Sequence, residues 1–124
     1  MYHDVLVVED EPTLRRIIAR NLAGRGHYVR EAGTAAEAVT ALLAAPPDLL
    51  LLDLNLPDCT GWDVLRKLRA HGLTVPTVVI SAVRVSQQRL AEFRPLAYLP
   101  KPFPLEALLR VVAGGQPVAA LEET

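Results

Sequence analysis

The chain has 124 residues, of which 51% are hydrophobic and 22% charged, and its formal net charge at pH 7 is −1. This size suits one domain with a buried core, and the near-neutral charge argues against direct binding of nucleic acid. A single cysteine, Cys59, excludes a disulfide within the chain. Because we find no signal segment and only short apolar runs, we expect a cytoplasmic protein without a membrane segment.

Five strand-like segments alternate with five helix-like segments. The expected strands are short apolar runs that cover, in chain order, residues 4–9, 28–31, 49–53, 77–81 and 97–99. The expected helices lie between Pro12 and Gly24 or Gly26, between Thr34 and Pro46, between Gly61 and Gly72, over 86–93, and from Leu105 to Gly114. Thr34 and Glu37 form a predicted capping box for the second helix. The fourth helix has the weakest pattern, and we expect it to be truncated or loosened.

The alternation of strands and helices predicts an α/β fold with a parallel sheet. Parallel neighbours need crossover connections, and right-handed crossovers place helices on the faces of the sheet. Ligands bind to such sheets beyond the carboxyl ends of the strands. Five polar residues stand at these ends and are therefore expected to share one pocket: Glu9, Asp10, Asp53, Ser81 and Lys101.

The acidic residues of this group predict a magnesium site. Carboxylates that gather at one place repel one another unless a cation lies among them, and a site with few oxygen ligands suits Mg²⁺ better than Zn²⁺. A Mg²⁺ ion held by Asp10 and Asp53 would bind one oxygen of a phosphoryl group. The Lys101 ammonium and the Ser81 hydroxyl would bind its other oxygens. An oxygen of Asp53 would then attack phosphorus and form an aspartyl phosphate.

Four motifs of the sequence resemble those of the receiver domains of bacterial two-component response regulators. They are Val7-Val8-Glu9-Asp10-Glu11, Leu52-Asp53-Leu54-Asn55-Leu56-Pro57-Asp58 with Gly61, Ile80-Ser81-Ala82, and Tyr98-Leu99-Pro100-Lys101-Pro102-Phe103. The resemblance extends from Val5 to about Val112. It implies a five-unit (βα)5 sheet with the flavodoxin-like strand order 2-1-3-4-5. Residues 1–115 would be the receiver domain, and 116–124 a tail or the start of a linker.

The resemblance also implies roles for individual residues. Asp53 would accept phosphate from a histidine kinase. The Mg²⁺ ligands would be Glu9, Asp10, Asp53 and the backbone carbonyl of Asn55. Ser81 would move toward the phosphoryl group, and Tyr98 would rotate into the vacated space, which switches an output surface. The Lys101–Pro102 peptide bond is expected to be cis, as in many receivers.

These roles describe a signalling switch and not an enzyme that turns over a separate metabolite. The protein would catalyse its own phosphorylation and its slow dephosphorylation. The implied partners are a sensor histidine kinase or phosphotransfer protein, and an output domain or downstream protein. A homodimer formed on phosphorylation is a further alternative, although Leu96, Ala97 and Ala107 stand where many DNA-binding regulators have acidic dimer contacts.

Simpler interpretations of the same residues stay open. Asp53 could cap a turn, residues 9–11 could favour the start of a helix by their charge, and Lys101 could be a surface lysine. The three histidines, His3, His27 and His71, are interpreted as surface residues, and Trp62 as packed at the start of the third helix.

Three other functions are alternatives. A phosphatase with an aspartate nucleophile would need a second acid where Asn55 stands. A flavodoxin would need a phosphate-binding loop after the first strand, where this chain has Glu9-Asp10-Glu11. The stronger alternative is an interaction module that has the receiver fold and works without phosphorylation.

Overall fold

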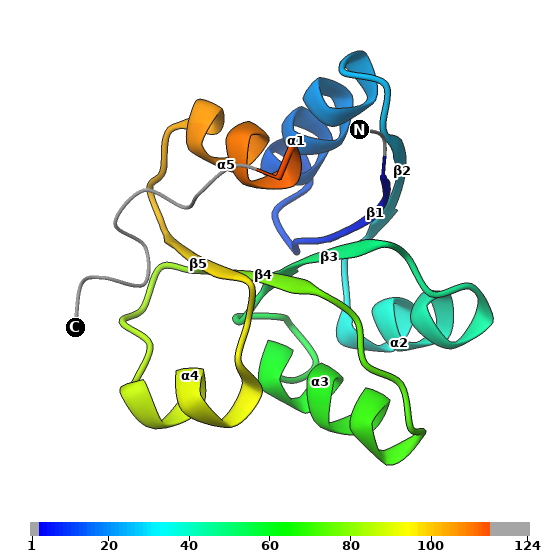
Figure 1. Ribbon diagram of the computed structural model, residues 1–124, viewed down its shortest axis with the longest axis vertical. Coiled ribbons are helices and arrows are strands. Elements are labelled where there is room, and N and C mark those ends of the chain that lie inside the picture. Colours follow the sequence, from blue (N-terminus) through cyan, green and yellow to red (C-terminus); the bar gives the residue numbers. More distant parts are fainter. Residues whose placement is uncertain (1–2, 115–124) are drawn as a thin grey trace.

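The computed structural model describes residues 3–114, and within them five strands form one parallel sheet (Figure 1). The strands are β1 Asp4–Val8, β2 Tyr28–Ala32, β3 Leu49–Asp53, β4 Thr77–Ser81 and β5 Ala97–Pro100. They lie in the order β2-β1-β3-β4-β5. The predicted α/β fold and its flavodoxin-like strand order are confirmed. The expected tail, residues 116–124, lies outside the described residues.

Five helices cover the two faces of the sheet. They are α1 Pro12–Gly24, α2 Ala35–Ala44, α3 Gly61–Ala70, α4 Gln87–Phe93 and α5 Leu105–Val112. Helices α1 and α5 lie on one face, and α2, α3 and α4 lie on the other (Figure 1). The strand order switches sides at β1, because β2 lies on one side of β1 and β3 on the other. Ligands bind in the crevice at such a switch point, between β1 and β3. Among the described helices, none is long and apolar enough to cross a membrane.

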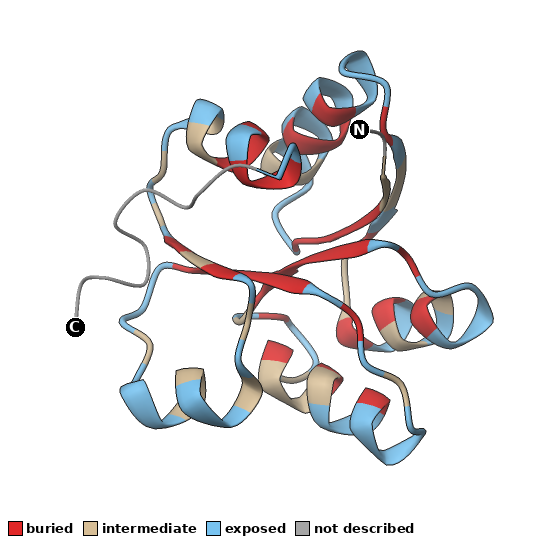
Figure 2. Cartoon of the chain, viewed as in Figure 1, coloured by how far each residue is buried: buried red, intermediate tan, exposed pale blue. Residues whose placement is uncertain are grey.

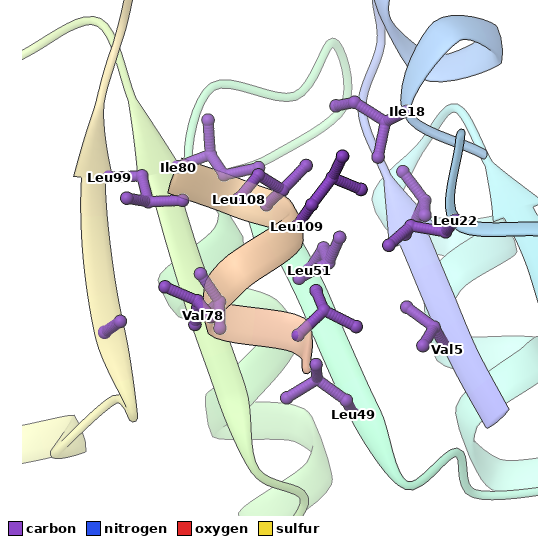
Figure 3. Close-up of a cluster of buried hydrophobic side chains, with 14 residues drawn as sticks. Val5, Ile18, Leu22, Leu49, Leu51, Val78, Ile80, Leu99, Leu108 and Leu109 are labelled. Carbon is purple, nitrogen blue, oxygen red and sulfur yellow. The ribbon is translucent and has the colours of Figure 1, made fainter. Parts of the chain in front are cut away.

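Two apolar layers hold the helices on the sheet, because side chains alternate along each strand. In β1, Val5 and Val7 belong to the layer that includes α1 and α5. Leu6 and Val8 belong to the layer that includes α2 and α3. Buried residues concentrate in the strands and on the inner sides of the helices (Figure 2). Figure 3 shows the first of these layers, with Leu108 of α5 among the strand side chains.

Side-chain caps stand at the start of four of the described helices, α1 to α4, and two of them involve capping-box residues. At α3, Thr60 and Asp63 form a complete capping box, in which each side chain accepts from the other's N–H at 3.2 Å. At α2, Thr34 accepts from the N–H of Glu37 at 3.1 Å. The Glu37 carboxylate, however, accepts from the N–H of Gly33 at 2.8 Å, one residue before the cap. The second half of the predicted box at Thr34 is therefore wrong.

Helix α4 is the shortest helix, with seven residues, and none of residues 87–93 is buried. The weak helix expected over 86–93 is present as Gln87–Phe93, with Ser86 as its N-cap. Its last residue, Phe93, stacks on Trp62 of α3 with ring centroids 4.9 Å apart. The guanidinium of Arg69 lies 4.8 Å from the centroid of the same Phe93 ring. This aromatic and cationic cluster joins the end of α4 to α3, and Trp62 packs at the start of α3 as predicted.

His27 corrects the interpretation of the histidines, because it is buried with only 8% of its surface exposed. Its N–H donates to the carbonyl of Leu22 in α1, and its Nδ1 accepts from the N–H of His3 at 3.1 Å. The two imidazole rings stack with centroids 5.5 Å apart. Burial lowers the pKa of His27, which favours the neutral ring that can accept this hydrogen bond. His71 is exposed, as predicted.

Candidate functional site

The carboxyl ends of four strands bring the predicted site residues to one edge of the sheet. Glu9 and Asp10 follow β1, Asp53 ends β3, and Ser81 ends β4. Lys101 directly follows β5, and its N–H donates to the carbonyl of Ser81 at 2.8 Å. The strands are in register at this edge, since Asp53 pairs with Ile80 and Ser81 with Pro100. The edge therefore gathers residues that are more than ninety positions apart in the sequence.

Three carboxylates form an acidic cluster at this edge. Glu9, Asp10 and Asp53 each offer an oxygen, and these three oxygens lie within 4.8 Å of one another. Glu9 and Asp53 are buried, with 0% and 2% of their surfaces exposed, whereas Asp10 is exposed. Such a set of hard oxygen ligands, open to solvent on one side, fits Mg²⁺, which keeps several waters and binds few carboxylates. The residues present thus suit the ion that the sequence predicts.

Lys101 lies between the two buried carboxylates. Its Nζ is 3.2 Å from Oδ2 of Asp53 and 2.8 Å from Oε1 of Glu9. Apart from this ion pair, Oε1 of Glu9 has no hydrogen-bond partner among the described residues. Three ionised carboxylates and one ammonium leave a formal charge of −2, which one divalent cation would balance.

The electrostatics of the site show in the pKa values of Glu9 and Lys101. Burial is the main reason that the pKa of Glu9 is raised to about 7, and the charge of Asp53 adds to the shift. Burial alone would lower the pKa of Lys101, but the close contact with Glu9 and the charge of Asp53 outweigh it, and the pKa is raised. Lys101 therefore stays charged, while Glu9 ionises only near neutral pH.

The loop after β3 fixes the orientation of Asp53. Its Oδ1 accepts from the N–H of Asn55 at 3.0 Å, while its Oδ2 faces Lys101. The same loop folds back so closely that a Cβ on Gly61 would lie 2.8 Å from the carbonyl oxygen of Asp53. Only glycine fits at this approach. The sequence analysis placed Gly61 at the start of a helix and in the same motif as Asp53, and its close approach to the carbonyl of Asp53 is an addition from the structure.

Ser81 and Tyr98 meet at the loop after β4 and do not touch the acidic cluster through any hydrogen bond found within residues 3–114. Ser81 Oγ donates to the carbonyl of Val83 at 2.7 Å and accepts from the N–H of Val83 at 3.0 Å. The Tyr98 hydroxyl donates to the same carbonyl at 3.4 Å. Tyr98 is half-buried and faces the side of the sheet opposite to Ala97 and Leu99, which belong to the layer of α1 and α5. The Lys101–Pro102 bond is cis, which confirms the expectation.

Arg15 of α1 is a residue that the sequence interpretation missed. Its Nη1 donates to the backbone carbonyl of Glu9 at 2.8 Å, and its Nε lies 3.2 Å from a carboxylate oxygen of Glu31. The sequence gives no signal that separates Arg15 from Arg16 beside it, because the contact joins segments that only the fold brings together.

Comparisons with known proteins agree with this geometry. The family model described as "Response regulator receiver domain" matches residues 5–113. The chain is 42% identical over 107 residues to the transcriptional regulatory protein KdpE of Mycobacterium tuberculosis, covering 85% of this chain and 47% of that protein. It is 37% identical over 107 residues to the response regulator MprA of Mycobacterium avium, with the same coverage. The chain thus spans about half the length of the curated relatives it matches.

Solved structures show the same fold. The non-phosphorylated HemR receiver domain from Leptospira biflexa is similar, with a TM-score of 0.79 and 30% identity, over 92% of this chain and 97% of that one. The chemotaxis protein CheY4 of Vibrio cholerae has a TM-score of 0.82 and 22% identity, over 94% of this chain and all of that one. These findings do not favour the phosphorylation-independent alternative. The chain belongs to the receiver domains of two-component response regulators, which act in phosphorylation-based signalling.

Proposed function

We propose that Asp53 is the residue that accepts the phosphoryl group, from a phosphohistidine of a sensor kinase or phosphotransfer protein. The single observation that carries this assignment is the placement of the Asp53 carboxylate, with Oδ1 held by the Asn55 N–H and Oδ2 facing Lys101. Glu9 has similar contacts, since its Oε2 accepts from the N–H of Glu11 and its Oε1 lies 2.8 Å from Nζ of Lys101. The resemblance of Leu52-Asp53-Leu54-Asn55 to the receiver motif therefore also supports Asp53 as the acceptor.

The proposed magnesium ligands are Glu9, Asp10, Asp53 and the backbone carbonyl of Asn55. The acidic cluster supports the first three, and a solved structure of the response regulator TrrA from Thermotoga maritima, 24% identical, holds Mg²⁺ and BeF. When bound, Mg²⁺ would neutralise charge on the transferring phosphoryl group. The role of Asn55 follows from the motif alone.

The transfer itself is a displacement at phosphorus. An oxygen of Asp53 forms the new P–O bond as the P–N bond of the phosphohistidine breaks, and the imidazole leaves with the electron pair. Lys101, held charged by its carboxylate neighbours, would move from the free carboxylate oxygens to an oxygen of the phosphoryl group. The chain would in this sense catalyse its own phosphorylation, while it remains a switch.

The switch is proposed to run through the carbonyl of Val83. To reach the phosphoryl group, the Ser81 hydroxyl must give up its 2.7 Å hydrogen bond to this carbonyl. The Tyr98 hydroxyl uses the same acceptor, so a movement of the loop at Val83 changes the surroundings of both residues. Phosphorylation would then bias two arrangements of the surface formed by α4 and β5.

The output is proposed to pass to a further domain or a downstream protein, because the curated relatives are about twice as long as the matched region and one is called a transcriptional regulatory protein. Residues 1–115 would form the receiver domain, with a linker or tail after them. Many regulators have acidic dimer contacts where this chain has Leu96, Ala97 and Ala107, and Ala97 is fully buried in β5. A phosphorylation-driven homodimer would therefore use other contacts.

The proposal is tested by incubating the protein with MgCl₂ and acetyl phosphate and measuring its intact mass. We expect an adduct of one phosphoryl group that disappears with EDTA and in Asp53→Asn. The matched control is Asp48→Asn, at the opposite end of the same strand, where the side chain accepts from the N–H of Asp4 at 2.8 Å. An unchanged adduct in Asp53→Asn, or no adduct in folded wild type, would overturn the assignment.

A further inference from the structure

The acidic cluster has one member that nothing holds directly. Within residues 3–114, the Asp10 carboxylate takes part in no hydrogen bond or ion pair, and the residue is exposed. Glu9, in contrast, is buried, and its Oε2 accepts from the N–H of Glu11 at 3.1 Å. The direction of the Asp10 side chain therefore depends on how its backbone is held.

Arg15 holds that backbone. Its Nη1 donates to the carbonyl of Glu9, which belongs to the peptide group that joins Glu9 to Asp10. The N–H of Glu9 donates in turn to the carbonyl of Ala32 at the end of β2, at 3.1 Å. Both main-chain polar groups of Glu9 are thus bound, one by the sheet and one by Arg15. The bond from Arg15 acts on the peptide plane that precedes Asp10, and the bond to Ala32 holds the peptide plane before it, between Val8 and Glu9.

Arg15 is itself held in place from two sides. Its Nε pairs with Glu31 of β2 at 3.2 Å, and its side chain is only 20% exposed. Gly33, in the loop after β2, lies against the guanidinium: a Cβ there would be 2.9 Å from Nη1 of Arg15. The neighbouring Arg16 also approaches Glu31, but at 3.8 Å and with 66% of its side chain exposed. Of the two arginines, only Arg15 is held against the loop after β1 and beside Gly33.

We propose that Arg15 is a positioning residue for the metal site: its guanidinium fixes the Glu9–Asp10 peptide so that the Asp10 carboxylate stays beside Glu9 and Asp53. This inference rests on the proposed magnesium site. Residues that orient metal ligands without touching the metal commonly change metal affinity about 10–100-fold when they are replaced.

Positioning and simple charge predict opposite results when Arg15 is removed. A positive charge near a cation site repels the cation, so the loss of that charge alone would tighten Mg²⁺ binding. The loss of a positioning contact weakens binding, because Asp10 then samples directions away from the cluster. The sign of the change in Mg²⁺ affinity therefore separates the two roles.

The experiment is a titration of the folded protein with MgCl₂ at constant ionic strength, followed by the amide NMR signals of Asp10 and Asn55. We expect the dissociation constant of Arg15→Gln to rise about 10-fold. Arg16→Gln, the matched control, should stay close to wild type. Arg15→Lys keeps the charge but lacks the fork that reaches two acceptors at once, and we expect only partial recovery.

Gly33→Ala provides a second variant that leaves Arg15 in the chain. The added methyl group crowds Nη1, and we expect weaker Mg²⁺ binding by a few-fold. This variant decides the question if Arg15→Gln does not fold. Unchanged or tighter binding in folded Arg15→Gln, or in Gly33→Ala where it is the deciding variant, would overturn the inference. If wild type itself binds no Mg²⁺, the proposed metal site fails instead, so the two failures are distinguishable.

Discussion

The hydroxyl groups of Ser81 and Tyr98 donate to one acceptor, the backbone carbonyl of Val83, at 2.7 and 3.4 Å. Two residues on neighbouring strands are thereby linked through a loop atom that lies outside the acidic cluster. The shorter bond is the stronger one, since hydrogen bonds weaken toward 3.5 Å. In this conformation the Ser81 hydroxyl is fully engaged with its own loop, as both donor and acceptor.

Replacing these hydroxyls is expected to affect stability unequally. Ser81→Ala loses a donated and an accepted bond and should lower the free energy of unfolding by about 1 kcal/mol. Tyr98→Phe loses only the long bond and should cost less than about 0.5 kcal/mol. Urea denaturation measures both. A larger loss in Tyr98→Phe than in Ser81→Ala would show that the tyrosine hydroxyl is the main contact of this loop.

The raised pKa of Glu9 predicts a pH dependence of stability in metal-free buffer. Between the ordinary pKa of 4.5 and the folded value of about 7, the unfolded chain releases a proton that the folded chain retains. The folded state is therefore progressively destabilised as pH rises through this window. Glu9→Gln has no carboxyl group that ionises in this window. Its stability relative to wild type should therefore increase with pH, by on the order of 2 kcal/mol near pH 8.

Urea unfolding of the two proteins across this pH range measures the difference. The control is Glu106→Gln in α5, whose side chain is 72% exposed, and whose difference from wild type should be flat. A difference between wild type and Glu9→Gln that is also flat with pH would contradict the raised pKa.

Lys101 is expected to be needed for stability when no metal is bound. Lys101→Met leaves Glu9 and Asp53 buried without their cation, and we expect a loss of roughly 2–4 kcal/mol. Millimolar MgCl₂ should restore part of this loss, because a divalent cation supplies the missing positive charge. Thermal unfolding with and without MgCl₂ tests both statements, and exposed Lys67→Met is the control. Equal stability of Lys101→Met and wild type in EDTA would speak against the ion-pair cluster.

Gly61 is predicted to be essential for the geometry of Asp53. In Gly61→Ala the new methyl group must displace backbone atoms of Asp53 and Leu54, at a cost of about 1–3 kcal/mol. The rate of phosphorylation by acetyl phosphate should fall with it. Gly24→Ala is the control: no heavy atom of the described residues outside its own helix approaches its Cβ position within 4 Å. A normal rate in Gly61→Ala would mean that the loop adapts without moving Asp53.

The attachment of α4 is predicted to depend on Phe93. None of residues 87–93 is buried. The stack of Phe93 on Trp62 joins α4 to α3, and its loss should therefore loosen α4. Phe93→Ala should speed hydrogen exchange of the α4 amides while leaving those of α3 nearly unchanged. Gln88→Ala, on the exposed side of α4, should change neither. Equal exchange in α4 of Phe93→Ala and wild type would place its anchor elsewhere.

The sequence predicts the fold well because its signals are local. The apolar runs at 49–53 and 77–81 and the alternation with amphipathic helices are enough to predict a parallel sheet, and they match β3 and β4. The candidate site follows from the same logic, since each of its residues stands at the end of a strand or within two positions after it. Asp53 and Lys101 are 48 positions apart and yet lie 3.2 Å from each other.

What the sequence could not predict depends on contacts between distant segments. Arg15 and Gly33 matter only because α1 and the loop after β2 meet beside Glu9. His27 follows the turn residues Arg25 and Gly26, but it is buried because its ring accepts a hydrogen bond from His3 and its N–H donates to Leu22 of α1. The second half of the box at Thr34 fails because the Glu37 carboxylate reaches an amide one residue earlier.

The residue that carries the phosphoryl group can be identified chemically. After reaction with acetyl phosphate and MgCl₂, borohydride reduces an aspartyl phosphate to homoserine, and peptide mass spectrometry gives its position. We expect homoserine at position 53 and at no other acidic residue of the cluster. Homoserine at Asp10, or a phosphorylated protein with position 53 unmodified, would contradict this expectation.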